Sequence, residues 1–461
     1  MFAFVQTADA QTRISAPEME KAAKLSLAVG ADDQAIDLAD ALLLRNNKDV
    51  TAHLIRSRAL RNIGHFADAR SAAREGWRHA ADDEERYTAA LLMAQALSSD
   101  DKRTRAQFWL RRARQAAPSE AHAAQAARDY RYVQRRNPWQ THLSFTLAPN
   151  SNINNGSARD TSALFYQFFN PFNPDGVEAT LGAASKALSG LEIGGDVQSR
   201  YRFHQTERTA HDLRMGLSYR TYQLSSQSRD DLDAQDAERI ADGSAPLNVS
   251  GGDFAYGTLR LGYGYKQLRK DGRGEFSLTA DLGQSFYGGS RYNSFVRAGI
   301  GQTYYTDQTT KLRFDLNTDL RQAQRGSDTQ NLSVSTGLSR QLPNGNGLYL
   351  GGSVAVLRSE TASLEYDELR LRGGYVLGRP VFGTSIQFGL GTSLREYDTS
   401  PHDAAGRRDL ELSADITATF KQIDYYGFNP TLSLNASTTN SNIGLYDVNR
   451  VGLSIGIASA F

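Results

Sequence analysis

Residues 311–321 read KLRFDLNTDLR, and apolar side chains alternate with polar or charged ones along this run. Successive side chains of a β-strand point to opposite faces, so the period of two predicts a strand with one apolar and one charged face. Strands of soluble proteins usually have about five or six residues, whereas a strand that crosses a bilayer needs about 9 to 11. The run therefore indicates a transmembrane strand, with its apolar face toward lipid and its charged face toward a lumen.

Similar alternation continues through the C-terminal two thirds of the chain, and almost no helix is expected there. The predicted strands are 139–148, 190–204, 210–223, 252–268, 274–287, 291–305, 309–322, 328–340, 347–358, 364–377, 381–395, 408–420, 425–438 and 447–461. Lipid offers no hydrogen-bond partner to an unpaired backbone group, so the sheet must close on itself. We therefore expect a C-terminal antiparallel transmembrane β-barrel of about 14 strands.

Loop lengths support this strand count. The longest connections, at 149–189, 224–251, 396–407 and 439–446, all follow odd-numbered strands, whereas connections such as Asp271–Arg273 and Thr306–Gln308 are short. Long outer loops and short periplasmic turns are typical of bacterial outer-membrane barrels. The first strand is then expected to start on the periplasmic side. The terminal Phe461, which follows alternating apolar residues, resembles the C-terminal signal recognised by the barrel-assembly machinery.

The N-terminal part has a different period. Between about residues 16 and 134, apolar residues recur at spacings of three and four, which predicts amphipathic helices. The segment Gly64–Ala73 opens a helix after a short turn, and Ala35 and Ala106 stand in the place of Ala69 at separations of 34 and 37 residues. This pattern resembles tetratricopeptide repeats, with about three degenerate units and a final helix over 119–134. An unrelated helical bundle is the alternative.

Composition narrows the possible chemistry. The 461 residues carry 52 Lys+Arg and 51 Asp+Glu, so a net charge of +1 gives no field for steering nucleic acid. The absence of cysteine excludes disulfides, thiolate metal sites and cysteine nucleophiles. The eight histidines show no paired ligand spacing. We expect no catalytic residue, no metal site, no cofactor and no nucleic-acid partner.

Three domains are expected. Residues 1–10, MFAFVQTADA, fit the end of a signal peptide with an Ala-x-Ala cleavage pattern, or else a frayed terminus. Residues 11–136 form the tetratricopeptide-like helical domain, expected in the periplasm. Residues 137–461 form the outer-membrane barrel.

The charged face of the strands supplies candidate functional residues in the lumen. Both signs are interleaved along it, whereas a simple ion-selective pore favours one sign at its constriction. The charges therefore pair either with each other, as a static network in the wall, or with a chain in transit. The candidates are Glu192, Asp196, Arg200, Arg202, Lys311, Arg313, Asp315, Asp319, Arg321, Glu368, Arg370, Arg372, Asp409, Glu411 and Asp415.

The junction between the two domains carries a more specific motif. Trp139 opens the first strand, and an Asn-rich turn with Asn150, Asn152 and Asn154 follows it. The turn lacks carboxylates before Asp160, so a tight turn with left-handed backbone is favoured over a calcium site. This junction, together with the two-domain order, resembles the surface lipoprotein assembly modulator (Slam) family, the outer-membrane components of type XI secretion.

The resemblance implies a function but no catalytic residue. It implies a translocator that delivers a client protein, either a surface lipoprotein or a secreted haem- or metal-scavenging protein, to the cell surface. Expected partners are outer-membrane lipid, the client, a periplasmic chaperone and the barrel-assembly machinery. The alternatives are a polysaccharide export barrel, which can also carry tetratricopeptide repeats, a passive porin, and a barrel enzyme, for which no nucleophile motif is visible.

Overall fold

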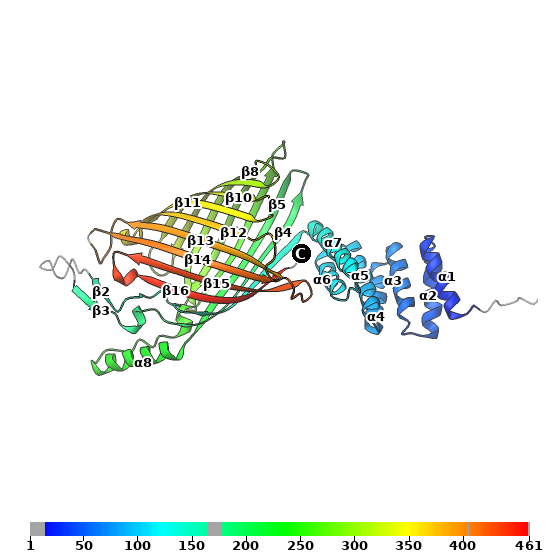
Figure 1. Cartoon of the computed structure of the whole chain (residues 1–461), viewed down its shortest axis with the longest axis horizontal. Coiled ribbons are helices and arrows are strands. Elements are labelled where there is room, and N and C mark those ends of the chain that lie inside the picture. The colour runs from blue at the N-terminus through cyan, green and yellow to red at the C-terminus, as the bar shows by residue number, and fades with distance from the viewer. Residues whose placement is uncertain (1–13, 165–176, 404, 460–461) are drawn as a thin grey trace, which may run out of the picture. The chain divides into compact units, whose positions relative to one another are not determined.

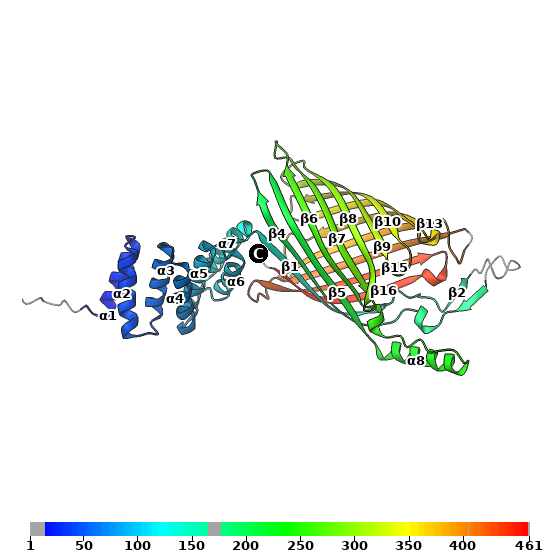
Figure 2. The same ribbon diagram turned by 180° about the vertical axis from the view of Figure 1, so that it is seen from behind.

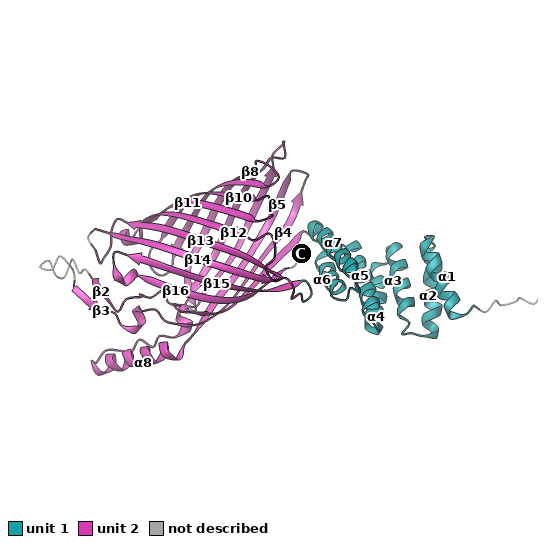
Figure 3. Cartoon of the chain, viewed as in Figure 1, with its two compact units in different colours: residues 1–137, 425–427, 461 teal, residues 138–424, 428–460 magenta. Residues whose placement is uncertain are grey.

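The computed structural model describes residues 14–164, 177–403 and 405–459. This part of the chain forms two compact units (Figure 3). The first unit is helical and extends to Asn137, and the second, which begins at Pro138, contains the barrel. The expected signal-peptide remnant, residues 1–10, and the expected assembly signal, Phe461, lie outside the described residues.

The helical unit has the tetratricopeptide-like architecture that the sequence predicted. Three pairs of neighbouring helices are followed by one more helix, and each helix packs on the next. Among the described residues before Pro138, the helices are α1 (Ala16–Ala28), α2 (Asp32–Arg45), α3 (Val50–Asn62), α4 (Phe66–His79), α5 (Asp83–Ser99), α6 (Arg103–Gln115) and α7 (Glu120–Arg136). No helix of the described chain has both the length and the apolar character needed to span a bilayer.

Small residues set the packing of these pairs. Ala35, Ala69 and Ala106 are each fully buried, and each lies in the second helix of its pair. A side chain limited to one methyl group allows two helices to approach closely. The alanines that recur in the sequence therefore mark the positions where neighbouring helices contact each other. Side-chain caps fix where individual helices begin: Asp49 accepts from the Ala52 amide at 2.9 Å, and Asp82 from the Glu85 amide at 2.8 Å.

The second unit is a closed barrel of antiparallel strands, and its strand count confirms the predicted 14. Each strand pairs with its neighbours in sequence, and β1 closes the barrel against β16 (Figures 1 and 2). The barrel strands are β1 (Trp139–Asn150), β4 (Gly190–Gln205), β5 (Thr209–Leu224), β6 (Tyr256–Leu268), β7 (Gly274–Tyr287), β8 (Ser290–Tyr305), β9 (Thr310–Ala323), β10 (Thr329–Gln341), β11 (Gly347–Ser359), β12 (Tyr366–Val376), β13 (Thr384–Tyr397), β14 (Arg407–Phe420), β15 (Phe428–Ser441) and β16 (Val448–Ser459).

The outer face of the barrel is apolar. Phe314, Leu316 and Leu320 on β9 are exposed, as are Val451, Leu453, Ile455 and Ile457 on β16. Exposed apolar side chains at every second position are the expected outer surface of a barrel that lies in lipid. The residues between them, among them Arg313 and Asp315, consequently face the lumen.

Three strands begin three or four residues later than the sequence predicted. Strand β6 starts at Tyr256 instead of residue 252, because residues Gly251–Phe254 form a 3₁₀ turn, and the other two share a different cause. Strand β13 starts at Thr384 instead of residue 381, and β15 starts at Phe428 instead of residue 425. In both cases an aromatic residue and a glycine before the strand have positive φ: 47° and 74° at Phe382 and Gly383, 52° and 73° at Tyr426 and Gly427. Two consecutive residues of this kind make a tight hairpin turn, which alternation of apolar residues alone does not distinguish from a strand.

Two structures inside the long loops were not predicted. Helix α8 (Ser226–Ala241) lies in the connection between β5 and β6, and strands β2 (Thr161–Leu164) and β3 (Val177–Thr180) pair in the first long loop. Both lie beyond the end of the barrel opposite to the start of β1 (Figure 1). Helix α8 is mostly polar and buries little besides Leu232 and Ser228, so it lacks the apolar stripe that reveals a helix. The residue that could have indicated the start of this helix is its N-cap, Ser225, whose side chain accepts from the Ser228 amide.

We predict that Ala69→Leu destabilises the helical unit by about 1–3 kcal/mol, because the added atoms must be accommodated at a fully buried contact. Ala67→Leu, at an exposed position of the same helix, is the matched control. Urea unfolding of the full chain in micelles, followed by helical circular dichroism, measures the difference. Equal stabilities of the two variants would show that Ala69 is not a packing contact.

Candidate functional site

Most of the predicted lumen charges form ion pairs along the barrel wall, some with one another and others with charged residues that were not predicted. The ion pairs that include predicted residues are Arg200–Asp212, Arg202–Asp212, Arg220–Glu192, Arg297–Asp319, Arg321–Asp319, Arg313–Asp315, Arg370–Glu368, Arg395–Glu368, Arg372–Asp415 and Arg407–Asp409. Most join residues on neighbouring strands or residues two apart on one strand. Alternation puts these charges on one face, where most of them lie beside a partner of opposite sign.

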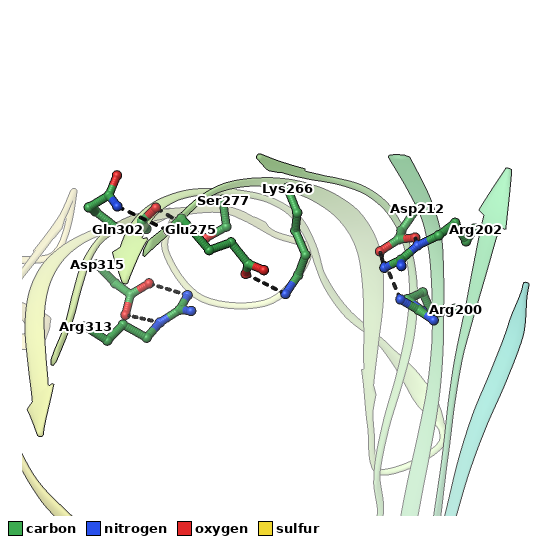
Figure 4. A network of polar contacts seen from close by, with 10 residues as sticks. Arg200, Arg202, Asp212, Lys266, Glu275, Ser277, Gln302, Arg313 and Asp315 are labelled. Carbon is green, nitrogen blue, oxygen red and sulfur yellow. Dashed lines mark hydrogen bonds and ion pairs between the residues drawn. The ribbon is translucent and has the colours of Figure 1, made fainter. Parts of the chain in front are cut away.

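Asp212 is the most buried member of this network. Its carboxylate accepts from Nε and Nη2 of Arg202 at 2.8 and 3.2 Å and from Nη1 of Arg200 at 3.4 Å (Figure 4). Its side chain is almost excluded from water, with 3% of the residue exposed. A buried carboxylate needs both charge compensation and hydrogen bonds, and β4 supplies both to β5 through the two arginines.

Other pairs extend the network around the wall. Arg313 binds Asp315 through two nitrogens at 2.8 and 2.6 Å, and Lys266 donates to Glu275 at 2.8 Å (Figure 4). Figure 4 shows these side chains on one common face of the curved sheet. Asp319 and Glu368 each accept from two arginines. The arrangement favours a charged wall whose members neutralise each other locally.

Three predicted lumen residues have no ion pair among the described residues. These are Asp196 on β4, Glu411 on β14 and Lys311 on β9, whose Nζ lies 5.9 Å from the Tyr305 ring centroid. The structure thus brings most, but not all, of the candidate set together in pairs.

Sequence reasoning missed several members of this network of ion pairs, all of them on barrel strands. They are Asp212, Arg214, Arg220, Lys266, Glu275, Asp281, Arg297, Arg395 and Arg407. Most of them belong to the strands β5 to β8, from which no lumen candidate was taken. The same alternation rule was available there: Asp212 and Arg214 stand two apart and share one face of β5.

The Asn-rich turn after β1 folds around the side chain of Asn152. This residue is fully buried, and its Nδ2 donates to the carbonyls of Gly156 at 2.8 Å and Asn449 at 3.2 Å. Its Oδ1 accepts from the Gly156 amide at 2.9 Å. A Cβ on Gly156 would lie 2.2 Å from the Lys186 carbonyl oxygen, so the close approach of two backbone segments requires glycine.

The flanking asparagines fix the rest of the turn. Asn150 accepts from the Asn152 amide at 3.0 Å and donates to Glu192 at 3.1 Å. Asn154 donates to the Lys186 carbonyl at 2.8 Å and accepts from the Leu188 amide at 2.9 Å. Asn155 has φ of 57°, the left-handed backbone that the sequence favoured there. The asparagine side chains thus form hydrogen bonds with backbone amides and carbonyls that have no partner in a regular ladder.

The same turn joins the first strand to the last strand and its preceding loop. Arg450 donates to the Asn152 carbonyl at 3.1 Å and to Asn155 Oδ1 at 2.9 Å. Arg159 and Asp447 form an ion pair at 2.7 Å. The Ser151 amide donates to the Val451 carbonyl at 3.1 Å. Residues 150–159 and 444–451 together are called the clasp from here on, because they connect the two ends of the sheet.

Trp139 does not belong to the clasp. It lies at the other end of β1, where its ring centroid is 4.7 Å from that of Tyr201 on β4. The tryptophan and the asparagines of the predicted motif therefore lie at opposite ends of β1, with Asn152 and Asn154 in the turn that follows the strand. Within the described part of the chain, no group of three or more His, Asp or Glu side chains is arranged to hold a metal ion.

Comparison with protein families gives a match over the C-terminal half. Residues 237–461 match the family model described as surface lipoprotein assembly modifier, which confirms the resemblance to that family that the sequence predicted. The matched range starts within α8 and includes β6 to β16, so the Asn-rich turn lies outside it. The family match and the closed barrel together support an outer-membrane protein. No curated protein matches the chain.

Solved structures resemble each unit separately. The loop L8 deletion mutant of OmpT from Vibrio cholerae is similar at 9% identity and a TM-score of 0.34, covering 69% of this chain and 98% of that chain. The TPR2B domain of yeast Sti1 in complex with pHsp70 is similar at 16% identity and a TM-score of 0.25, covering 26% and 97%. The Yersinia enterocolitica chaperone SycD is similar at 13% identity and a TM-score of 0.24, covering 28% and 90%.

We predict that Asp212→Ala destabilises the barrel by about 3 kcal/mol, because it leaves two arginines without their shared counter-ion. The temperature at which migration on a gel changes from the folded to the unfolded form measures this. Asp196→Ala on the adjacent strand is the matched control, because this carboxylate forms no ion pair with any residue that the structure describes. If both variants behave like the wild type, the pairs do not stabilise the wall.

We predict that Asn152→Ala also lowers barrel stability, by about 3 kcal/mol, because the buried amide and carbonyl of Gly156 and the carbonyl of Asn449 lose their partner. The same gel assay is used. Asn331→Ala on β10 is the control, since no hydrogen bond of that side chain is present among the described residues. A stable Asn152→Ala barrel would show that the clasp is not held by this side chain.

Proposed function

We propose, with the family match over residues 237–461 as the premise, that this chain is an outer-membrane translocator that delivers a client protein to the cell surface. The family description names surface lipoproteins, so a lipoprotein is the proposed client class. We assign the chain no enzymatic reaction. The single observation that supports the proposal best is the family match on a closed 14-stranded barrel.

The proposal places the helical unit in the periplasm. Connections between β4 and β5, β6 and β7, and β8 and β9 are short and lie at the end of the barrel where β1 begins. The long connections, which contain α8 and the β2–β3 sheet, lie at the opposite end (Figure 2). Short turns face the periplasm in bacterial barrels, so β1 would start there and residues before it would be periplasmic.

In this proposal the helical repeats receive the client or a chaperone that carries it. Paired helices of this kind stack into an extended surface that commonly binds protein segments. The basic last repeats, with ten Lys+Arg against four Asp+Glu between residues 100 and 136, suit an acidic segment.

The lumen charges have a supporting role in the proposal. Since Arg202, Arg313 and Arg372 each have a carboxylate partner on the wall, a client would have to break ion pairs in order to bind them. We therefore propose that the paired residues hold the shape of the wall. Asp196, Glu411 and Lys311 form no ion pair among the described residues. They remain the candidates for contact with an exported client.

Deleting residues 11–134 tests the proposal. We expect the shortened chain to assemble as a barrel with heat-modifiable migration, because the two units are separately compact, and surface delivery to be lost. Surface labelling of lipoproteins on intact cells, normalised to assembled barrel, is the measurement. Cells with the full chain and cells without it are the controls.

The outcomes separate the alternatives. Unchanged surface lipoproteins in cells that lack the chain would contradict the proposal. A loss of surface polysaccharide in the same cells would favour an export barrel for glycans. If the shortened chain delivers lipoproteins normally, the helical unit is not the receiving domain.

A further inference from the structure

The junction between the first and last barrel strands differs from every other strand pair. Strand β1 pairs with β4 at each position from Trp139 to Asn150. On its other side, among the described residues, β1 pairs in register with β16 at only Leu147↔Ile455 and Asn150↔Gly452. The barrel is therefore closed by a short ladder at one place on its circumference, called the seam below.

Pro149 accounts for part of the interruption. The Ser151 amide points to β16, since it donates to the Val451 carbonyl. Backbone groups alternate in direction along a strand, so Pro149, two residues earlier, faces the seam as well. Proline has no N–H to donate. It therefore removes one hydrogen bond of the ladder between the two registered pairs.

Beyond Leu147, toward the start of β1, the ladder is interrupted at three successive positions. Continued in register, Thr146, Phe145 and Ser144 would face Gly456, Ile457 and Ala458, and none of these three pairs forms. The same β16 residues do pair on their other side, with Thr431, Pro430 and Asn429 of β15. At these three positions β16 is therefore paired with β15 alone.

The opposite end of the seam is held firmly. There the clasp adds side-chain bonds from Asn152 and Arg450 to the backbone of the facing segment. An interface that is fixed at one end and has an interrupted ladder beyond it can open at the interruption, with the fixed end as the hinge. The opening edge lies at the end where β1 begins.

Unpaired backbone groups inside a bilayer cost several kcal/mol each, so an open edge in lipid favours the addition of another strand. The side chains define which strand fits. Phe145 and Ile457 are 62% and 48% exposed on the lipid face, whereas Ser144 and Ala458 are small residues on the lumen face. An added strand would need apolar residues at alternate positions and small or polar ones between them.

We propose that the barrel wall opens between β1 and β16 at the end with Ser144 and Ala458, with the clasp as hinge, and that the open edges accept an extended strand of the exported client. This inference rests on the proposed function for the identity of the occupant. The opening itself depends only on the seam.

A disulfide lock tests the opening. The chain contains no cysteine, so Ser144→Cys with Ala458→Cys introduces a single possible bridge on the lumen face of the seam. Oxidation should block surface delivery, and reduction should restore it. The matched control is Ser433→Cys with Ser454→Cys, which links β15 to β16 at a registered pair that stays closed in the proposal. Its delivery should not depend on oxidation.

The result separates this inference from the proposed function. If the seam disulfide forms completely and delivery continues, the seam does not open for transport, while the translocator function stands. If the reduced and wild-type chains also fail to deliver lipoproteins, the proposed function is wrong. Failure of the disulfide to form in assembled barrel would contradict the register, and with it the inference.

A second measurement needs no client. A synthetic peptide with the sequence of residues 448–459, carrying a cysteine in place of Ala458, is added to purified Ser144→Cys chain in micelles. The peptide copies the natural partner of the β1 edge, so we expect it to form a mixed disulfide with the chain. A scrambled peptide, and a chain with Ser335→Cys on the fully paired β10, should react far less. Equal reaction of both peptides would overturn strand addition.

Discussion

The structure depends on one requirement: each backbone N–H and C=O in the bilayer needs a partner within the protein. That requirement turns alternating segments such as 311–321 into a closed sheet, and it sends apolar side chains outward and charged ones inward. The inward charges then need partners of their own, which the strands provide as ion pairs such as Arg202–Asp212. The barrel wall therefore has two sets of internal partners: backbone hydrogen bonds between strands, and ion pairs between the charged side chains on its inner face.

The seam is the place where this requirement is met least fully, and the clasp is the local compensation. Side chains of Asn152 and Arg450 supply hydrogen bonds where the ladder between β1 and β16 is short. The motif that carried the family resemblance thus has a physical role that needs no ligand. Its asparagines connect the first and last strands of one sheet at the end of the seam where registered pairs remain.

Much of the fold could be predicted because two periods dominate the sequence. A period of two gave the barrel strands, and recurring alanines at Ala35, Ala69 and Ala106 marked the helix pairs. Helix α8 and the β2–β3 sheet could not be predicted from apolar periodicity, since each packs on a loop through a few residues. The pairing of Arg313 with Asp315 followed from spacing, but the burial of Asp212 and the reach of Asn152 to Asn449 depend on how the barrel closes.

The clasp also has a consequence for the order of folding. Asn152 and Asn449 are 297 residues apart, so the contact between them forms only after nearly the whole barrel has been synthesised and arranged. Contacts between residues so far apart in sequence form slowly. Until β16 is in place, the edge of β1 that faces it has no partner. A free edge is a site for pairing with any other nascent strand. Pro149 lies on that edge and has no N–H, so it protects the waiting strand against wrong partners during biogenesis.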